Sequence, residues 1–365
     1  MMEPYYEKYY KHHAPPANVL LHRETDLIAS VNVSGRSNPG EIISALAHAG
    51  FKGILIDCIA SGGKFRHDAE NLKLYAETAE KYSMKCGLDI PCAVPGKTSR
   101  AQQTFRKQLR ELLGCGATLF EVRLNNTEQM GKPEWDALYH AIRQVQPEAV
   151  ISGGPDRRRG SRNGILPDFS SSRYIPRDCF NNGESPNNTK SIERHYALGN
   201  PFNGLYYLQP ECDIALPETA AQLAELYLQS AGNGGVLNVR ISLDKQGRIP
   251  EETPALLKAS GELLRDLRAH EILSWYLNEG DQMLELYPDA FDLIELKEDM
   301  SAGERVRSWK IEGKLDNQWQ TLAEGTIIGF SRIRKLENLC SCTMLRMTLT
   351  GGGAELRLYR GSNEQ

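Results

Sequence analysis

Short apolar runs alternate with amphipathic segments of helical period from about residue 26 onward. The run "DLIASVNV" precedes "EIISALAHAG", "FKGILIDCIA" precedes "DAENLKLYAETAEKYS", and "MKCGLDIPC" precedes "SRAQQTFRKQLRELLGCG". Helix ends are marked by glycine, as at Gly50 and Gly114. Strands that alternate with helices of this length pair in parallel through right-handed crossovers. The pattern therefore predicts an α/β domain.

Two architectures fit such a series of units: an open doubly wound sheet, and a closed (β/α)8-like (TIM-type) barrel, complete or incomplete. No glycine-rich phosphate fingerprint follows the first strand, which disfavours a dinucleotide-binding open sheet. We therefore predict the barrel over residues 26–272, preceded by an N-terminal tail, 1–25. Its working residues should lie at the carboxyl ends of the strands.

One long segment, residues 155–203, interrupts the alternation and is rich in Gly, Pro, Asn, Ser and Arg. A loop of this length in a compact domain is usually a functional cover or a mobile segment. Its arginines fit a solvated surface or a ligand contact equally well.

The character of the chain changes after His270, where short strands with turn signals replace the helices. Examples are "FDLIELKED", "CTMLRMTLT" and "AELRLYRG", with "GKLDNQW" as a hairpin candidate. We predict a small all-β sandwich over residues 273–365. Trp309 and Trp319 could form a sugar-stacking platform, but their spacing along strands favours the sandwich core.

The composition excludes several classes of protein. The chain has 365 residues and a net charge of -4, which argues against a general nucleic-acid binder or a basic membrane-surface protein. No run approaches the ~20 apolar residues of a transmembrane helix. The N-terminus has no apolar h-region, so we expect a cytoplasmic protein as the chain stands, or a secreted or periplasmic one if a leader was removed. The sequence does not indicate an oligomeric state.

Cysteines and histidines predict no metal site, and we expect no cofactor. "CSC" at residues 340–342 has too short a spacing for a structural zinc knuckle. His12 and His13 fall in the predicted tail, where a solvated role is typical. We interpret the eight cysteines as mostly buried thiols of a reducing compartment.

The strand "TLFEVRLNN", residues 118–126, carries unusual polar groups. Alternation along a strand puts Glu121 and Arg123 on one face of an otherwise apolar segment. Asn125 closes the strand, where an enzyme of this size usually has a carboxylate. Glu121 and Arg123 are therefore candidate substrate contacts.

Three segments resemble the α-L-fucosidases of glycoside hydrolase family 29. The stretch from 220 to 264 carries the helix end "S-x-G-x-N-G", the strand "L-L-L-N" and the turn "G-x-I-P" at Ser230, Leu237, Asn238 and Pro250, among others. "DALYHAIRQVQPEAVIS" resembles the family's "I-R-x-x-Q-P-x-A-V-I" unit. "FDLIELKEDMSAGERVRSWKIEG" with "GTIIGFSRI" is similar to the discoidin-like (galactose-binding-like) sandwich of many members. The resemblance implies a hydrolase of fucosylated glycans.

Members of this family are retaining glycosidases, in which two carboxyl groups lie only ~5 Å apart. The family nucleophile is an aspartate that closes a strand of the type "W-F/L-D-G". The matching place here reads "R-L-N-N", so Asn125 stands in for the aspartate, and an amide is a poor nucleophile. The fucose-binding histidines are absent from the matching "IASVNVSG" and "CIASGGKF". Arg157, Arg158 and Arg159 replace the aromatic residue after "G-P-D".

Four further residues are candidates for the site. "LQPECDIAL" matches the family's acid/base segment, which implies that role for Glu211 and a substrate contact for Asp213. The alternative is that Glu211 is an ion-paired loop residue, with Arg123 as its partner across the barrel mouth. Asp57 and Asp89, at the ends of neighbouring strands, could replace the nucleophile, although this would require a shifted sugar.

Three functions remain open from the sequence. The first is a pseudoenzyme that binds fucosylated or other glycans without hydrolysing them well. The second is an active retaining glycosidase with a relocated carboxylate nucleophile. The third is a non-catalytic scaffold or interaction protein. Residue chemistry favours the first.

Overall fold

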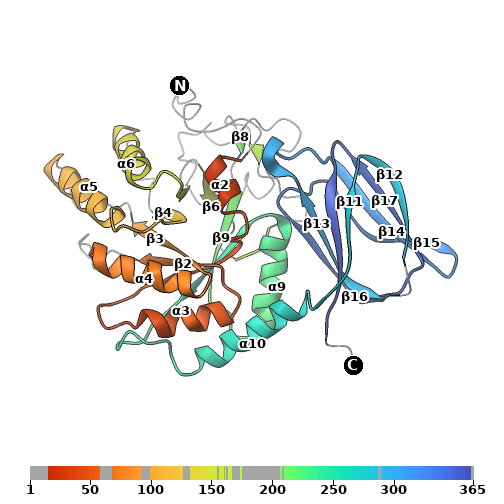
Figure 1. Cartoon of the computed structure of the whole chain (residues 1–365), viewed down its shortest axis with the longest axis horizontal. Coiled ribbons are helices and arrows are strands. Elements are labelled where there is room, and N and C mark those ends of the chain that lie inside the picture. Colours follow the sequence, from red (N-terminus) through yellow and green to blue (C-terminus); the bar gives the residue numbers. More distant parts are fainter. Residues whose placement is uncertain are drawn as a thin grey trace.

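In the computed structural model of the protein, a barrel and a β-sandwich lie side by side (Figure 1). The structure describes residues 15–57, 68–91, 99–125, 132–153, 156–159, 161, 163–166, 173–174, 206–207, 209–286 and 289–362.

The described part of the chain contains eight parallel strands that close into a barrel in the order β1-β10-β9-β6-β5-β4-β3-β2. These strands are β1 (Leu27–Val31), β2 (Gly53–Asp57), β3 (Lys85–Pro91), β4 (Glu121–Asn125), β5 (Val150–Ser152), β6 (Arg157–Arg159), β9 (Gln209–Ala215) and β10 (Val236–Ile241). The predicted (β/α)8-like barrel is therefore confirmed.

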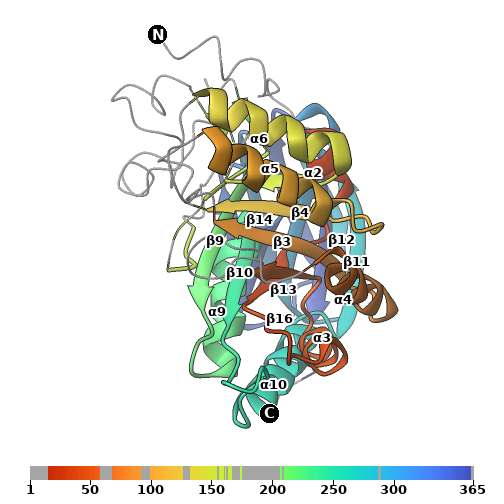
Figure 2. The same ribbon diagram turned by 90° about the vertical axis from the view of Figure 1, so that its left-hand side faces the viewer.

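Helices cover the outside of the barrel. They are α3 (Pro39–His48), α4 (Ala69–Lys81), α5 (Ser99–Leu113), α6 (Lys132–Val145), α9 (Ala220–Ser230) and α10 (Thr253–Asp266), with the short α2 (Ala17–Leu21) before β1 and η3 (Ala231–Asn233) after α9. Helices α3 to α6 lie on the side away from the sandwich (Figure 2). Only four residues separate β5 from β6, too few for a crossover helix, so the ring of helices is incomplete.

Local sequence signals explain where these helices begin. The side chain of Asn38 accepts a hydrogen bond from the Gly40 backbone, and Pro39 occupies the first helical position of α3. Thr219 and Gln222 form a reciprocal capping box at the start of α9. These caps satisfy backbone N–H groups that would otherwise lack partners at the helix ends.

Apolar side chains occupy only part of the barrel interior. Most of the core lies between the strands and the surrounding helices. Inside the barrel, Ile28, Leu55, Phe120 and Val236 form a separate apolar cluster. Gly87 packs against this cluster and leaves no room for a side chain of its own, since a Cβ at that position would lie only 2.8 Å from the Leu55 side chain. The side chains nearer the carboxyl ends of the strands are polar and charged.

The C-terminal part of the chain is a sandwich of two four-stranded antiparallel sheets, ordered β11-β18-β13-β16 and β12-β17-β14-β15. The strands are β11 (His270–Leu277), β12 (Gly280–Glu285), β13 (Phe291–Glu298), β14 (Ser308–Leu315), β15 (Gln318–Gly325), β16 (Arg332–Cys340), β17 (Met344–Thr350) and β18 (Ala354–Arg360), with η4 (Met300–Ala302) between β13 and β14. The predicted sandwich is confirmed. Trp309 is 2% exposed in its core, whereas Trp319 stacks under Arg346 at 4.7 Å.

The two units share a core at their junction. Leu293, Ile333 and Tyr359 of the sandwich belong to the same apolar cluster as the barrel strands and helices. Arg334 donates a hydrogen bond of 2.9 Å to Asn233 of η3, and Arg268 pairs with Glu295 at 2.8 Å. One face of the sheet β11-β18-β13-β16 therefore packs directly against the barrel.

Several sequence predictions fall outside the described residues. Most of residues 155–203 do, as do His12 and His13. Within that segment the structure describes β6 and β7 (Arg173–Tyr174), and β7 pairs with β8 (Tyr206–Tyr207), which follows the segment. The described cysteines are buried free thiols, namely Cys86, Cys115, Cys212, Cys340 and Cys342. Among the described helices, none is long and apolar enough to cross a membrane. The described residues contain no group of three or more His, Cys, Asp or Glu side chains arranged to hold a metal ion.

Candidate functional site at the barrel mouth

Strand β4 carries the candidate residues to the barrel interior. Glu121, Arg123 and Asn125 alternate along it, and its register pairs Arg123 with Asp89 of β3 and with Ser152 of β5. Directly paired residues of neighbouring strands point to the same face of a sheet. The polar side chains of three adjacent strands therefore meet inside the barrel.

Arg123 lies at the centre of this polar group. Its guanidinium lies 3.1 Å from the Asp89 carboxylate and 3.0 Å from that of Glu211, and it also pairs with Asp213. The side chain is only 3% exposed. The surrounding carboxylates raise the pKa of Arg123 further above its ordinary value, against the opposing effect of burial. We name Arg123, Asp89, Glu211 and Asp213 the Arg123 cluster.

Glu211, the candidate acid/base, is held inside this cluster. One carboxylate oxygen lies beside Arg123, and the other accepts a 2.5 Å hydrogen bond from Ser152. The residue is 1% exposed. The ion pair between Glu211 and Arg123, an alternative that the sequence had left open, is present in the structure, although Glu211 lies on β9 rather than in a loop.

Asp213 and Asp89 are similarly engaged. Asn238 donates a 2.8 Å hydrogen bond to Asp213 and itself accepts one of 2.9 Å from Ser30. Asp89 accepts from the side-chain amide of Asn125 on one oxygen and from Arg123 on the other. Asn125, which the resemblance places in the nucleophile position, therefore acts as a hydrogen-bond donor to a carboxylate.

A second ion pair lies deeper in the barrel. Arg157 of β6 contacts the Glu121 carboxylate at 2.6 Å and donates a 3.0 Å hydrogen bond to Gln209. Arg157 and Glu121 are both fully buried. Burial and the neighbouring Glu211 raise the pKa of Glu121 well above its usual value, although Arg157 opposes this effect. Arg157 thus belongs to neither of the environments that the sequence suggested for it, a solvated loop or a ligand contact.

Asp57 is the candidate that lies outside the Arg123 cluster. It ends β2 and pairs in register with Asp89, and its side chain is half-buried. Four polar residues of the barrel interior were not predicted as site residues, namely Ser30, Ser152, Gln209 and Asn238. Asn238 was visible only as part of a family motif, Gln209 lies beside Glu211 in "LQPECDIAL", and the two serines are small polar residues within apolar runs.

No protein-family model matches the chain. It is 24% identical over 315 residues to the rice (Oryza sativa subsp. japonica) protein named "Putative alpha-L-fucosidase 1", and the match covers 72% of this chain. It is 22% identical over 308 residues to "Alpha-L-fucosidase 1" of Arabidopsis thaliana, covering 70% of this chain. The chain is a distant homologue of the α-L-fucosidases. It spans 59% and 60% of the lengths of these two relatives.

Solved structures of fucosidases share the fold of this α-L-fucosidase homologue. A Ruminococcus gnavus GH29 fucosidase, solved in complex with fucose, superposes with a TM-score of 0.77 at 14% identity, covering 97% of this chain and 96% of that one. The protein SpGH29 gives a TM-score of 0.79 at 16% identity, covering 96% and 99%. Both matches extend over the barrel and the sandwich together.

Proposed function

We propose that this fucosidase-like protein binds glycans at the mouth of its barrel without hydrolysing them. The observation that carries the proposal is the position of Arg123, whose guanidinium contacts Asp89, Glu211 and Asp213. A retaining glycosidase needs one carboxylate free to attack the sugar and a second free to protonate the leaving oxygen. The Arg123 cluster instead engages its three carboxylates with an arginine of the same chain.

The state of Glu211 supports the absence of acid catalysis. A general acid must come within hydrogen-bonding reach of the oxygen that it protonates. Arg123 and Ser152 lie against the two oxygens of Glu211, and the residue is 1% exposed. Neither oxygen is left to face a glycosidic bond.

The nucleophile position supports the same conclusion. Asn125 offers a neutral amide, and its hydrogen bond to Asp89 also engages the nearest carboxylate that could replace it. A second candidate function, hydrolysis with a relocated nucleophile, depends on Asp57, which is half-buried at the end of β2 and lies outside the Arg123 cluster.

Glycan binding is supported by the polar groups that remain accessible. Asp57, Asp89 and Asn125 lie at or near the carboxyl ends of three adjacent strands and are partly exposed. Carboxylates and amides are among the groups that fix the orientation of polar ligands in binding pockets. The homologous R. gnavus fucosidase has been solved with fucose bound.

The test combines a hydrolysis assay with a binding assay on the same preparation. We expect no fucose release from aryl α-L-fucosides or fucosylated oligosaccharides, and saturable binding of fucosylated oligosaccharides by calorimetry. Asp57→Asn and Glu211→Gln serve as the paired variants. Release by the wild type that Asp57→Asn abolishes would establish the relocated-nucleophile alternative, and release that only Glu211→Gln abolishes would contradict the absence of acid catalysis. A protein that neither releases fucose nor binds a glycan would be a scaffold, and the proposal would be wrong.

A further inference from the structure

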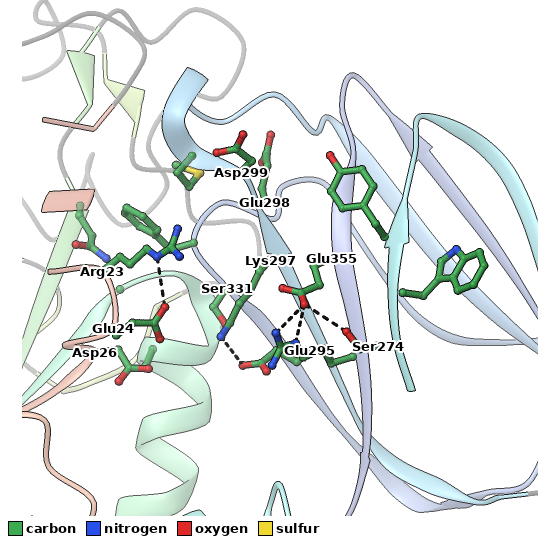
Figure 3. Close-up of a pocket in the computed structure, with 18 residues that line it drawn as sticks. Arg23, Glu24, Asp26, Ser274, Glu295, Lys297, Glu298, Asp299, Ser331 and Glu355 are labelled. Carbon is green, nitrogen blue, oxygen red and sulfur yellow. Dashed lines mark hydrogen bonds and ion pairs between the residues drawn. The ribbon is translucent and has the colours of Figure 1, made fainter. Parts of the chain in front are cut away.

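A cavity of about 480 Å³ lies between the barrel and the sandwich (Figure 3). On the barrel side it is lined by Arg23, Glu24 and Asp26, which precede β1, and by Gln209, the first residue of β9. These positions are at the amino-terminal end of the barrel, opposite the mouth. Its volume is typical of small-ligand pockets, which span ~300–1,000 Å³. We name it the junction cavity.

The sandwich side of the junction cavity is built from two cross-strand rows. The first row pairs Tyr276 of β11 with Glu355 of β18 and Glu355 with Lys297 of β13. The second row pairs Ser274 with Arg357 and Arg357 with Glu295. Because residues in direct register share a face of the sheet, both rows face the barrel residues.

Acidic groups outnumber basic groups around this cavity. The acidic lining residues are Glu24, Asp26, Glu295, Glu298, Asp299 and Glu355, and the basic ones are Arg23, Lys297 and Arg357. Each base already has an acidic partner in the lining: Arg23 lies 3.4 Å from Glu24, Lys297 3.7 Å from Glu295, and Arg357 2.7 Å from Glu355. An anionic ligand would therefore have to displace a carboxylate. A cation meets a small excess of acidic groups, even with Arg268 beside Glu295 and Arg305 beside Glu298.

Asp26 is the carboxylate in this lining best placed to receive such a cation. It is half-buried and accepts a 2.8 Å hydrogen bond from the neutral Tyr227 hydroxyl. In the portion of the chain that the structure describes, no lysine or arginine forms an ion pair with Asp26, although the charges of Arg268 and Lys297 act on it from nearby. Burial raises the pKa of Asp26, so a cation alongside would favour its charged form.

Two other features of the wall fit the same ligand. Tyr276 is 54% exposed, and the face of an aromatic ring attracts ammonium and guanidinium groups. The Ser331 hydroxyl, also in the lining, is buried and meets no hydrogen-bond partner within the described residues. It can accept a hydrogen bond from a ligand N–H group.

We propose that the junction cavity binds an organic cation, with its guanidinium or ammonium group held by Asp26 and Glu24. Figure 3 shows Glu24 and Asp26 facing Glu295, Lys297 and Glu355 across the cavity. The inference concerns the end of the barrel opposite the mouth and is independent of whether the mouth binds glycans.

The test is calorimetric titration of the full chain with matched probes. The probes are N-acetyl-arginine amide and its neutral isostere N-acetyl-citrulline amide, with agmatine as a cation that lacks a peptide group. We expect the arginine probe to bind at least about tenfold more tightly than the citrulline probe. If agmatine binds more tightly than the arginine probe, the natural ligand is a free amine. If it binds more weakly, the ligand is a side chain presented by a peptide.

Variants locate the binding. Asp26→Asn should weaken the arginine probe by about tenfold and Glu24→Gln by a few fold, with Glu24 exposed enough for its variant to fold normally. Asp281→Asn, on the other sheet of the sandwich, is the matched control and should leave binding unchanged. Equal binding of arginine and citrulline probes, binding insensitive to both cavity variants, or no saturable binding would each overturn the proposal.

Discussion

The side-chain amide of Asn125 donates a hydrogen bond to the Asp89 carboxylate. The fucosidase resemblance implies a nucleophilic aspartate at position 125. The amide therefore acts as a neutral partner for a carboxylate that Arg123 also binds. Restoring an aspartate at this position would place two acids in contact.

Asn125→Asp should consequently destabilise the protein at neutral pH. Two carboxylates in contact cannot both ionise freely, and pKa shifts of this kind correspond to about 1–4 kcal/mol. The loss should shrink at acidic pH, where the pair can keep a shared proton. Urea unfolding of wild type and variant at neutral and at acidic pH measures this loss of unfolding free energy. Asn125→Ala, which removes the hydrogen bond but adds no charge, should show a loss independent of pH.

Arg123→Met should destabilise the fold strongly because it leaves Asp89, Glu211 and Asp213 without their shared cation. Removing one partner of a buried ion pair typically costs about 3–5 kcal/mol. Lys73→Met, which breaks the exposed pair with Glu77 on α4, should change stability by less than about 0.5 kcal/mol. Chemical denaturation compares the two variants. Similar losses from both would mean that the Arg123 cluster does not stabilise the barrel.

His22 should make stability depend on pH between 4 and 6.5. Burial, together with Lys85 and Arg157, lowers its pKa from 6.5 to about 4, and Lys85 donates to its ring at 2.9 Å. As the pH falls through this range the unfolded chain gains a proton that the folded chain does not, so stability should fall by roughly 3 kcal/mol. His22→Gln should remove this component. An NMR titration giving an ordinary histidine pKa would contradict the assignment.

The contribution of Glu121 to stability should depend on pH in the opposite direction to that of His22, and Glu121→Gln tests this. Because the folded protein raises the pKa of Glu121, the wild-type carboxyl stabilises the fold most at low pH and loses that contribution as the pH rises above 4.5. The difference in unfolding free energy between wild type and variant should therefore move in favour of the glutamine variant as the pH increases. Unfolding free energies that stay parallel across the pH range would indicate an ordinary pKa for Glu121.

The architecture could be predicted from sequence because periodicity records which face of each element is buried. Alternating apolar strands and amphipathic helices predicted the α/β domain, and the absence of a phosphate fingerprint favoured the barrel over an open sheet. Helix-free strands with turn signals predicted the sandwich. Strand alternation also placed Glu121 and Arg123 on one face, as the register of β4 bears out.

The partners inside the barrel could not be predicted in the same way. Arg123 contacts Glu211 and Asp213 on β9, about ninety residues away along the chain, and only the closure of the barrel brings them together. Arg157 looked like one of many loop arginines because the three-residue strand β6 is too short to show a period. Asp26 and the sandwich rows likewise meet only where two units pack.

Gln209 lies between the junction cavity and the buried ion pairs inside the barrel. The residue lines the junction cavity, and its side chain accepts a hydrogen bond from Arg157, which pairs with Glu121 beneath Glu211 and Arg123. Asp89 and Asn125 extend this series to the mouth. A continuous column of polar groups thus runs the length of the barrel, and a charge introduced at one end acts on partners that are buried away from the screening of bulk solvent.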